Sequence, residues 1–198
     1  MYLTDDSGTG IQQRMSHVNT MADTVLVNAS PEDLRAILRN MLSSKTPGLV
    51  SAFITSTRTR LCQRSGAAEG ILSPFSECGA IAPQTLKSLT RARLMYGSGL
   101  GFASLPLLAA IVRSTIGCRW SSESRVADAL VVVDADIDQA LQSCREEIQA
   151  SGPVDYSTRR KVLDELTCAL EDSRLDVDGW GGEFPFERAV FSAQDLKL

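Results

Sequence analysis

The most constraining feature of the sequence is an unbroken helical repeat of apolar side chains between Ser122 and Ala150. Apolar residues recur there every three or four positions, the spacing that places side chains on one face of an α-helix. The stretch contains neither glycine nor proline. It therefore predicts one helix of about 28 residues, about 42 Å long. The residues of the stripe are Val126, Leu130, Val133, Ile137, Leu141, Cys144 and Ile148.

Within this stretch, "LVVVDADIDQ" from Leu130 to Gln139 has a second reading, as an apolar strand that ends in an Asp-x-Asp motif. A strand would favour a metal-assisted phosphatase or a sugar-nucleotide transferase. An alternating strand pattern does not fit, because three consecutive valines precede the alternating aspartates. We therefore interpret the stretch as helix, which removes the support for both enzyme classes.

Other segments carry helix signals of their own. In "NASPEDLRAILRNMLSS", Ser30 and Asp33 form a capping-box pattern around Pro31, which predicts a helix at about residues 31–43. The segment Leu105–Ile116 is apolar on nearly every side, which is typical of a central helix. Further helices are expected to begin at Pro47, at Pro83 and near Pro153, the last ending at about Asp172. Only Thr24–Asn28 is a candidate for extended structure.

These segments predict an all-α fold of five or six helices around one core, with the long helix at about 122–150 at its centre. Residues 1–22 are polar and without periodicity, so we expect a flexible N-terminal tail. The helical domain is expected over residues 23–192, followed by a short C-terminal tail over 193–198. Residues 65–82 are rich in glycine, serine and proline and are expected to form a loop.

Charge and hydropathy narrow the classes of function. The chain has a net charge of −4, whereas proteins that bind polyanions are normally basic with a clustered patch, so a nucleic-acid partner is not expected. No apolar run approaches the roughly 20 residues needed to span a bilayer, so we expect no membrane partner. The first twenty residues contain no apolar stretch of signal-peptide length, and we expect an intracellular, cytoplasmic protein.

The chain has few of the cysteine and histidine residues that serve as metal ligands or general bases. The five cysteines form no Cys-x-x-Cys pair, and the only histidine is His17, in the predicted tail. Zinc and haem sites need clustered ligands, and a catalytic triad needs a rigidly held base. We therefore predict no catalytic residue, no resident metal and no cofactor.

Asp134, Asp136 and Asp138 are the cluster that would best suit a metal ion. Residues two apart on a helix point about 200° from each other, so only Asp134 and Asp138 share a face. Carboxylates on a facing helix would complete a Mg²⁺ site, the candidates being Asp164, Glu165, Glu171 and Asp172. This arrangement gives our alternative hypothesis, a small-ligand-binding or Mg²⁺-assisted helical enzyme. The more usual role of such residues is a solvated helix face.

Five arginines form a candidate anion site if the helices that carry them pack together. A guanidinium group suits phosphate because it presents a planar fork of donors. No aromatic residues are interleaved with these arginines, so a solvated basic face is the more usual outcome. The five are Arg58, Arg60, Arg64, Arg91 and Arg93.

The least generic stretch is "WGGEFPFERAVF", which places large aromatic side chains on a glycine-hinged segment. It either folds back over the end of the bundle or anchors another chain, since tryptophan and other aromatic residues are prominent in interfaces. On the long helix, two valines lie more than 90° from the centre of the apolar stripe and would be exposed unless a second surface covers them. The candidate interface is therefore Val131, Val132, Trp180, Phe184 and Phe186.

The stretches "YGSGLGFASLPLLAAIVRSTIG" and "WGGEFPFERA" resemble an uncharacterised family of small all-helical proteins from filamentous fungi. The resemblance covers most of residues 22–190 and implies a lineage without an activity, cofactor or site.

Our leading hypothesis is a non-enzymatic intracellular helical module that binds a protein partner or self-associates, as a homodimer.

Overall fold

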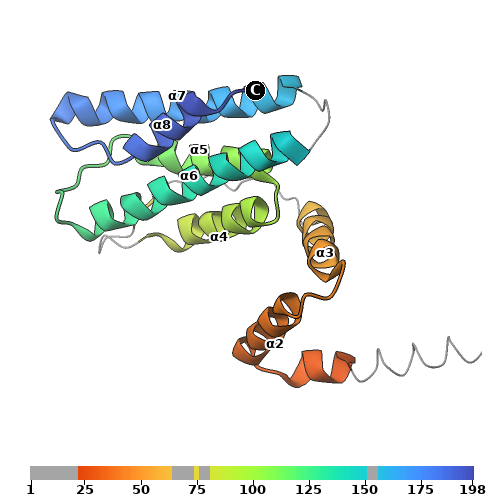
Figure 1. Cartoon of the computed structure of the whole chain (residues 1–198). Coiled ribbons are helices and arrows are strands. Elements are labelled where there is room, and N and C mark those ends of the chain that lie inside the picture. Colours follow the sequence, from red (N-terminus) through yellow and green to blue (C-terminus); the bar gives the residue numbers. More distant parts are fainter. Residues whose placement is uncertain (1–21, 64–73, 76–80, 151–155) are drawn as a thin grey trace, which may run out of the picture. The chain divides into compact units, whose positions relative to one another are not determined.

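The computed structural model describes residues 22–63, 74–75, 81–150 and 156–198, and in these ranges the chain is all-α (Figure 1). The predicted fold class is therefore confirmed. The described residues form eight helices rather than five or six, and they contain no strand beyond one isolated bridge between Phe75 and Ile81. One additional helix lies at residues 22–28, where Thr24–Asn28 was a candidate for extended structure, so that interpretation was wrong.

The chain divides between Phe53 and Ile54 into two compact units, so the predicted domain over 23–192 spans their boundary. The first unit contains the helix at 22–28, α2 (Pro31–Ser43) and the start of α3 (Leu49–Gln63). The predicted cap of α2 is present, because the backbone N–H of Asp33 donates to the Ser30 hydroxyl at 3.1 Å. No residue of α2 is buried, although its apolar side chains follow the helical repeat.

The second unit is built around α5 (Gly101–Ser114), which contacts α4 (Pro83–Gly97), α6 (Arg125–Ala150) and α7 (Tyr156–Trp180). Nine of the 14 residues of α5 are buried, as its lack of a polar face predicted. Its first residue lies against the backbone of α6, since a Cβ on Gly101 would come within 2.5 Å of the Cys144 nitrogen. Glycine is therefore required where these helices meet.

The long helix of the sequence analysis is α6, which spans 26 residues. It begins at Arg125 rather than Ser122 because the hydroxyl of Ser124 accepts a hydrogen bond from the backbone N–H of Ala127 at 3.3 Å and caps the first turn. All but the two terminal residues of the predicted stripe, Val126 and Ile148, are buried, and those two are half-buried. The helical interpretation of Leu130–Gln139 is therefore correct.

The helix α7 extends eight residues beyond the predicted end at Asp172, because Ser173 and Val177 continue its buried face. It ends where Gly181 adopts a positive φ of 73°. The expected start at Pro153 lies outside the described residues, as do residues 1–21 of the predicted N-terminal tail and most of the loop over 65–82.

The final helix, α8 (Glu187–Asp195), was not predicted. It packs against α6 and contacts α7 (Figure 1). The expected C-terminal tail begins inside this helix, and both Ala193 and Leu196 are buried. The segment after Trp180 thus folds back over the bundle and contributes to its core.

Candidate functional site

The three aspartates of α6 bind two different neighbouring helices. Asp136 points to α4, where its carboxylate accepts hydrogen bonds from the Arg93 Nη2 at 2.6 Å and the Tyr96 hydroxyl at 2.8 Å. Asp134 and Asp138 share the opposite face, as predicted, and that face meets α8. The geometry follows from the helical repeat, which separates residues two apart by about 200°.

Asp134 supplies the N-terminal cap that α8 lacks. No side chain next to α8 in sequence caps its first turn, and the backbone N–H of Ala189 instead donates to the Asp134 Oδ1 at 2.8 Å. Four residues further along α6, Asp138 accepts a hydrogen bond from the Ser192 hydroxyl at 2.5 Å. Together these bonds attach α8 to α6, so both carboxylates have a structural role.

Burial changes the proton affinity of this network. The pKa of Asp134 is raised, mainly because burial disfavours the charged carboxylate, although the bond from Ala189 acts in the opposite direction. Burial, and then the bond to Asp136, raises the pKa of Tyr96 to about 12. The hydrogen bond to Asp136 raises the pKa of Arg93. Tyr96 therefore stays a neutral donor at physiological pH, and Arg93 stays a cation.

The carboxylates proposed for a facing metal shell do not converge with those of α6. Asp164 pairs with Arg160 at 2.9 Å, and Glu165 pairs with Arg113 at 2.9 Å. Among the described residues, no group of three or more histidine, cysteine, aspartate or glutamate side chains is placed to hold a metal ion. The Mg²⁺-assisted hypothesis therefore gains no support from the geometry.

The candidate arginines that the structure describes have separate surroundings. Arg93 is occupied by Asp136, and the Arg58 Nε donates to the Ser98 carbonyl at 2.6 Å. Arg91 lines an open groove on α4 together with Lys87. Arg60 lies on α3, and Arg64 lies outside the described residues.

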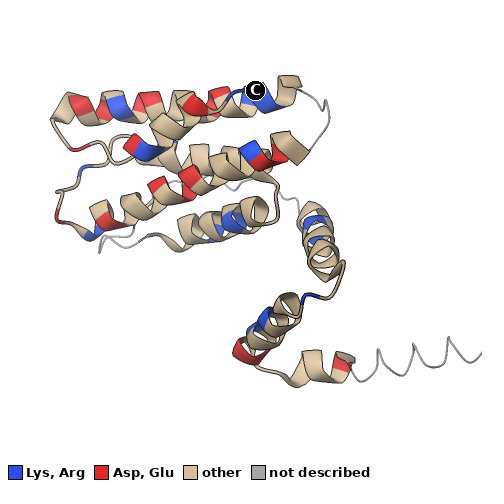
Figure 2. Ribbon diagram, viewed as in Figure 1, with Lys and Arg blue, Asp and Glu red and all other residues tan. Residues whose placement is uncertain are grey.

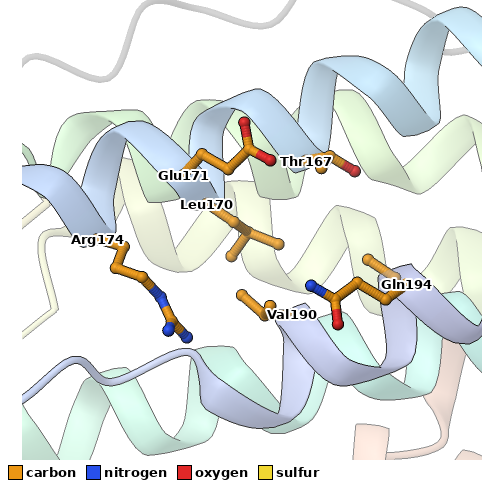
Figure 3. Close-up of a pocket in the computed structure, with 7 residues that line it drawn as sticks. Thr167, Leu170, Glu171, Arg174, Val190 and Gln194 are labelled. Atoms are coloured by element: carbon orange, nitrogen blue, oxygen red, sulfur yellow. The ribbon is translucent and has the colours of Figure 1, made fainter.

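A cleft of about 170 Å³ lies between α7 and α8 (Figure 3). This volume is below the roughly 300–1,000 Å³ of typical small-molecule pockets. One of its polar side chains, Arg174, already pairs with Glu187 at 2.7 Å. The cleft is lined by Thr167, Leu170, Glu171, Arg174, Val190, Ala193 and Gln194. Its size does not favour the small-ligand hypothesis.

The fold places some of the apolar interface candidates close to one another. Val131 is 60% exposed and Val132 is 45% exposed. Val131 lines a depression of about 240 Å³ with Phe184 and Trp120. The ring of Trp180 packs edge-on against that of Trp120, with centroids 5.3 Å apart. The depression also contains Ser122, Ala127, Glu183 and Pro185.

Phe186 does not belong to this surface, because its side chain is fully buried in the core. Its ring contacts the ring of Phe184 edge-to-face, with centroids 5.8 Å apart. Trp120 was missed in the sequence analysis, because it lies outside both the long helix and the aromatic C-terminal segment. The half-buried rings of Trp120 and Phe184 lie beside Val131, and the exposed Val132 follows Val131 on α6. We call these four residues the valine surface.

No family model, curated protein or solved structure matches this chain. The resemblance to small fungal proteins stays a prediction. Within the described residues, no helix is long and apolar enough to cross a membrane.

Proposed function

We propose that this protein is a non-enzymatic, intracellular helical module that uses the valine surface to bind a protein partner or a second copy of itself. The observation that carries the proposal is the exposure of two adjacent valines on α6, a helix whose remaining faces are committed to α4, α5 and α8. Because these valines are already partly covered, burying the rest of each in an interface would contribute about 1 kcal/mol.

The surroundings of the valines support this role. The Arg174 guanidinium lies 4.4 Å from the centroid of the Phe184 ring, and Arg119 lies 5.3 Å from that of Trp180. Arg119 also pairs with Asp176 at 2.9 Å. An apolar centre with ordered charges and aromatic rings beside it is the usual composition of a binding surface. The depression beside Val131 would receive one anchoring side chain of the partner.

Light scattering during size-exclusion chromatography tests self-association. We would compare the wild-type protein with a Val131→Asp, Val132→Asp variant at several concentrations. The matched control is Gln139→Asp, Gln142→Asp, which adds the same charge to exposed positions of the same helix. We expect the wild type and the control to share a molar mass that increases with concentration, whereas the valine variant stays monomeric.

The chain offers a second readout at the same place, because Trp120 and Trp180 are its only tryptophans. A change in tryptophan emission that accompanies association, and is absent in the valine variant, would assign the contact to this surface. A monomer in all three proteins would contradict self-association and leave a different protein as the partner. Association that survives equally in the valine variant would contradict the proposal for this surface.

A further inference from the structure

A second surface, independent of the valine surface, lies where the end of α3 meets α4. It is an open groove of about 870 Å³. The groove has an apolar floor and basic residues beside it. Its lining residues are Leu61, Pro83, Leu86, Lys87, Thr90, Arg91 and Leu94.

The groove gives α4 two apolar faces. One face carries Leu89, Ala92 and Met95, which are buried in the core. The other carries Leu86 and Leu94, which are 49% and 51% exposed. These two leucines lie eight residues apart, about two helical turns or 12 Å. That length matches the anchor spacing of an amphipathic helix bound in a groove.

The described helices beside this groove carry basic side chains and no acidic ones. Neither α4 nor residues 54–63 of α3 contain an aspartate or glutamate, whereas acidic residues are prominent on α6 and α7 (Figure 2). Arg93 pairs with Asp136, and the exposed Lys87 lines the groove beside Arg91. A ligand that fits both properties must present apolar side chains together with negative charge.

We propose that this groove binds an acidic amphipathic helix of a protein partner. Leucines of the partner would contact Leu61, Leu86 and Leu94, while its glutamates or aspartates would lie beside Lys87 and Arg91. A nucleic acid is a poorer fit, because the described lining contains no aromatic residue on which bases could stack.

The test is fluorescence polarisation with the full chain and a labelled helical peptide of about 15 residues, near the length at which isolated helices become marginally stable. The peptide carries leucines at helical spacing flanked by glutamates, and its twin carries lysines at the same flanking positions. We expect the acidic peptide to bind at least about tenfold more tightly than its lysine twin, with a preference that weakens as salt is added.

Three variants assign the binding to the groove. Leu86→Asp with Leu94→Asp should abolish it, and Lys87→Glu with Arg91→Glu should reverse the preference in favour of the lysine peptide. Gln84→Glu lies on the exposed part of α4 outside the groove and should change the affinity less than about twofold. The Val131→Asp, Val132→Asp variant should bind the acidic peptide as the wild type does, which separates this proposal from the function proposed above.

Equal affinity for the two peptides, or equal binding by the leucine variant, would overturn the proposal. Tighter binding of a single-stranded oligonucleotide at the same site would assign the groove to nucleic acid instead. A larger fall in unfolding temperature for the leucine variant than for Gln84→Glu, with no peptide binding by the wild type, would assign it to a segment of this chain.

Discussion

Residues 22–53 and residues 54–198 form their helices by the same local rules, but only the second group has a hydrophobic core. All 25 buried hydrophobic residues of the described chain lie beyond residue 53. Of the sixteen large hydrophobic side chains that are exposed among the described residues, eight lie in the much shorter first unit. The helix α2 thus has a cap and an apolar stripe but no buried residue, whereas α5 is buried among three neighbouring helices.

We expect the largest difference between the two units in the stability that is lost when a leucine is replaced by alanine. Leu108→Ala removes a fully buried side chain of α5 and should lower the free energy of unfolding by about 2–5 kcal/mol. Leu38→Ala on α2 removes a side chain that is 40% exposed and should cost less than about 1 kcal/mol. Urea denaturation followed by circular dichroism measures both changes. Equal costs would contradict the contrast between the units.

Within the second unit, replacing a closely packed glycine by alanine should cost more stability than replacing an open one. Gly101→Ala would place a Cβ against the backbone of α6, which cannot move as a side chain can, so we expect a loss of about 1–3 kcal/mol. Gly97→Ala is the control, because nothing lies within 4 Å of its Cβ position. It should be neutral or stabilise the protein by up to about 1 kcal/mol. A Gly101→Ala variant as stable as the control would contradict the close approach of α5 and α6.

Breaking an ion pair should also cost more stability in the second unit than in the first. Arg93→Met would leave the buried carboxylate of Asp136 with Tyr96 as its remaining side-chain donor, and we expect a loss of about 1–3 kcal/mol. Arg35→Met breaks an exposed pair with Glu32 on α2 and should cost about 0.2–0.5 kcal/mol. Thermal unfolding of both variants provides the measurement. A cost for Arg93→Met as small as that for Arg35→Met would show that the Asp136 network contributes little stability.

The smallest expected effect is the pH dependence of the bond between α6 and α8. The pKa of Asp134 is raised in the folded state, so its contribution is most favourable at low pH and is lost as the pH rises through that pKa. Asp134→Asn keeps an acceptor for the Ala189 N–H but does not titrate. Its stability relative to wild type should therefore increase between about pH 4 and about pH 7.

Urea denaturation at several pH values measures this difference. Asp128→Asn, at an exposed position of the same helix, is the control for removing a negative charge. A stability difference between Asp134→Asn and wild type that is independent of pH, or that falls as the pH rises, would contradict a raised pKa for Asp134.

Local patterns predicted the elements whose signals are local. The stripe of α6 and the Ser30 cap of α2 both depend on residues a few positions apart, and both are present. The helix α8 was missed because its cap is supplied by Asp134, which is 55 residues distant from Ala189 in sequence. No local rule indicates such a bond, since a lone aspartate on a helix normally contacts water.

The candidate site residues show the same dependence on distant partners. The acidic cluster suggested a metal site because the partners of its carboxylates, Arg93 on α4 and Ser192 on α8, are invisible to a local pattern. Phe186 was assigned to the interface although the fold buries it. Val131 and Val132 were correctly expected to lie off the apolar stripe of α6, because that expectation needs only the helical repeat.

The most direct test of the proposed interaction is site-specific photo-crosslinking from the valine surface. A benzophenone side chain is introduced at position 131 and, as a control, at position 142 on an exposed part of the same helix. Each protein is irradiated both in purified form and in an extract of the cells that produce it. Our account predicts a discrete crosslinked product from position 131, with a second copy or with one other protein, and none from position 142. Equal yields from the two positions, or no product from either, would contradict it.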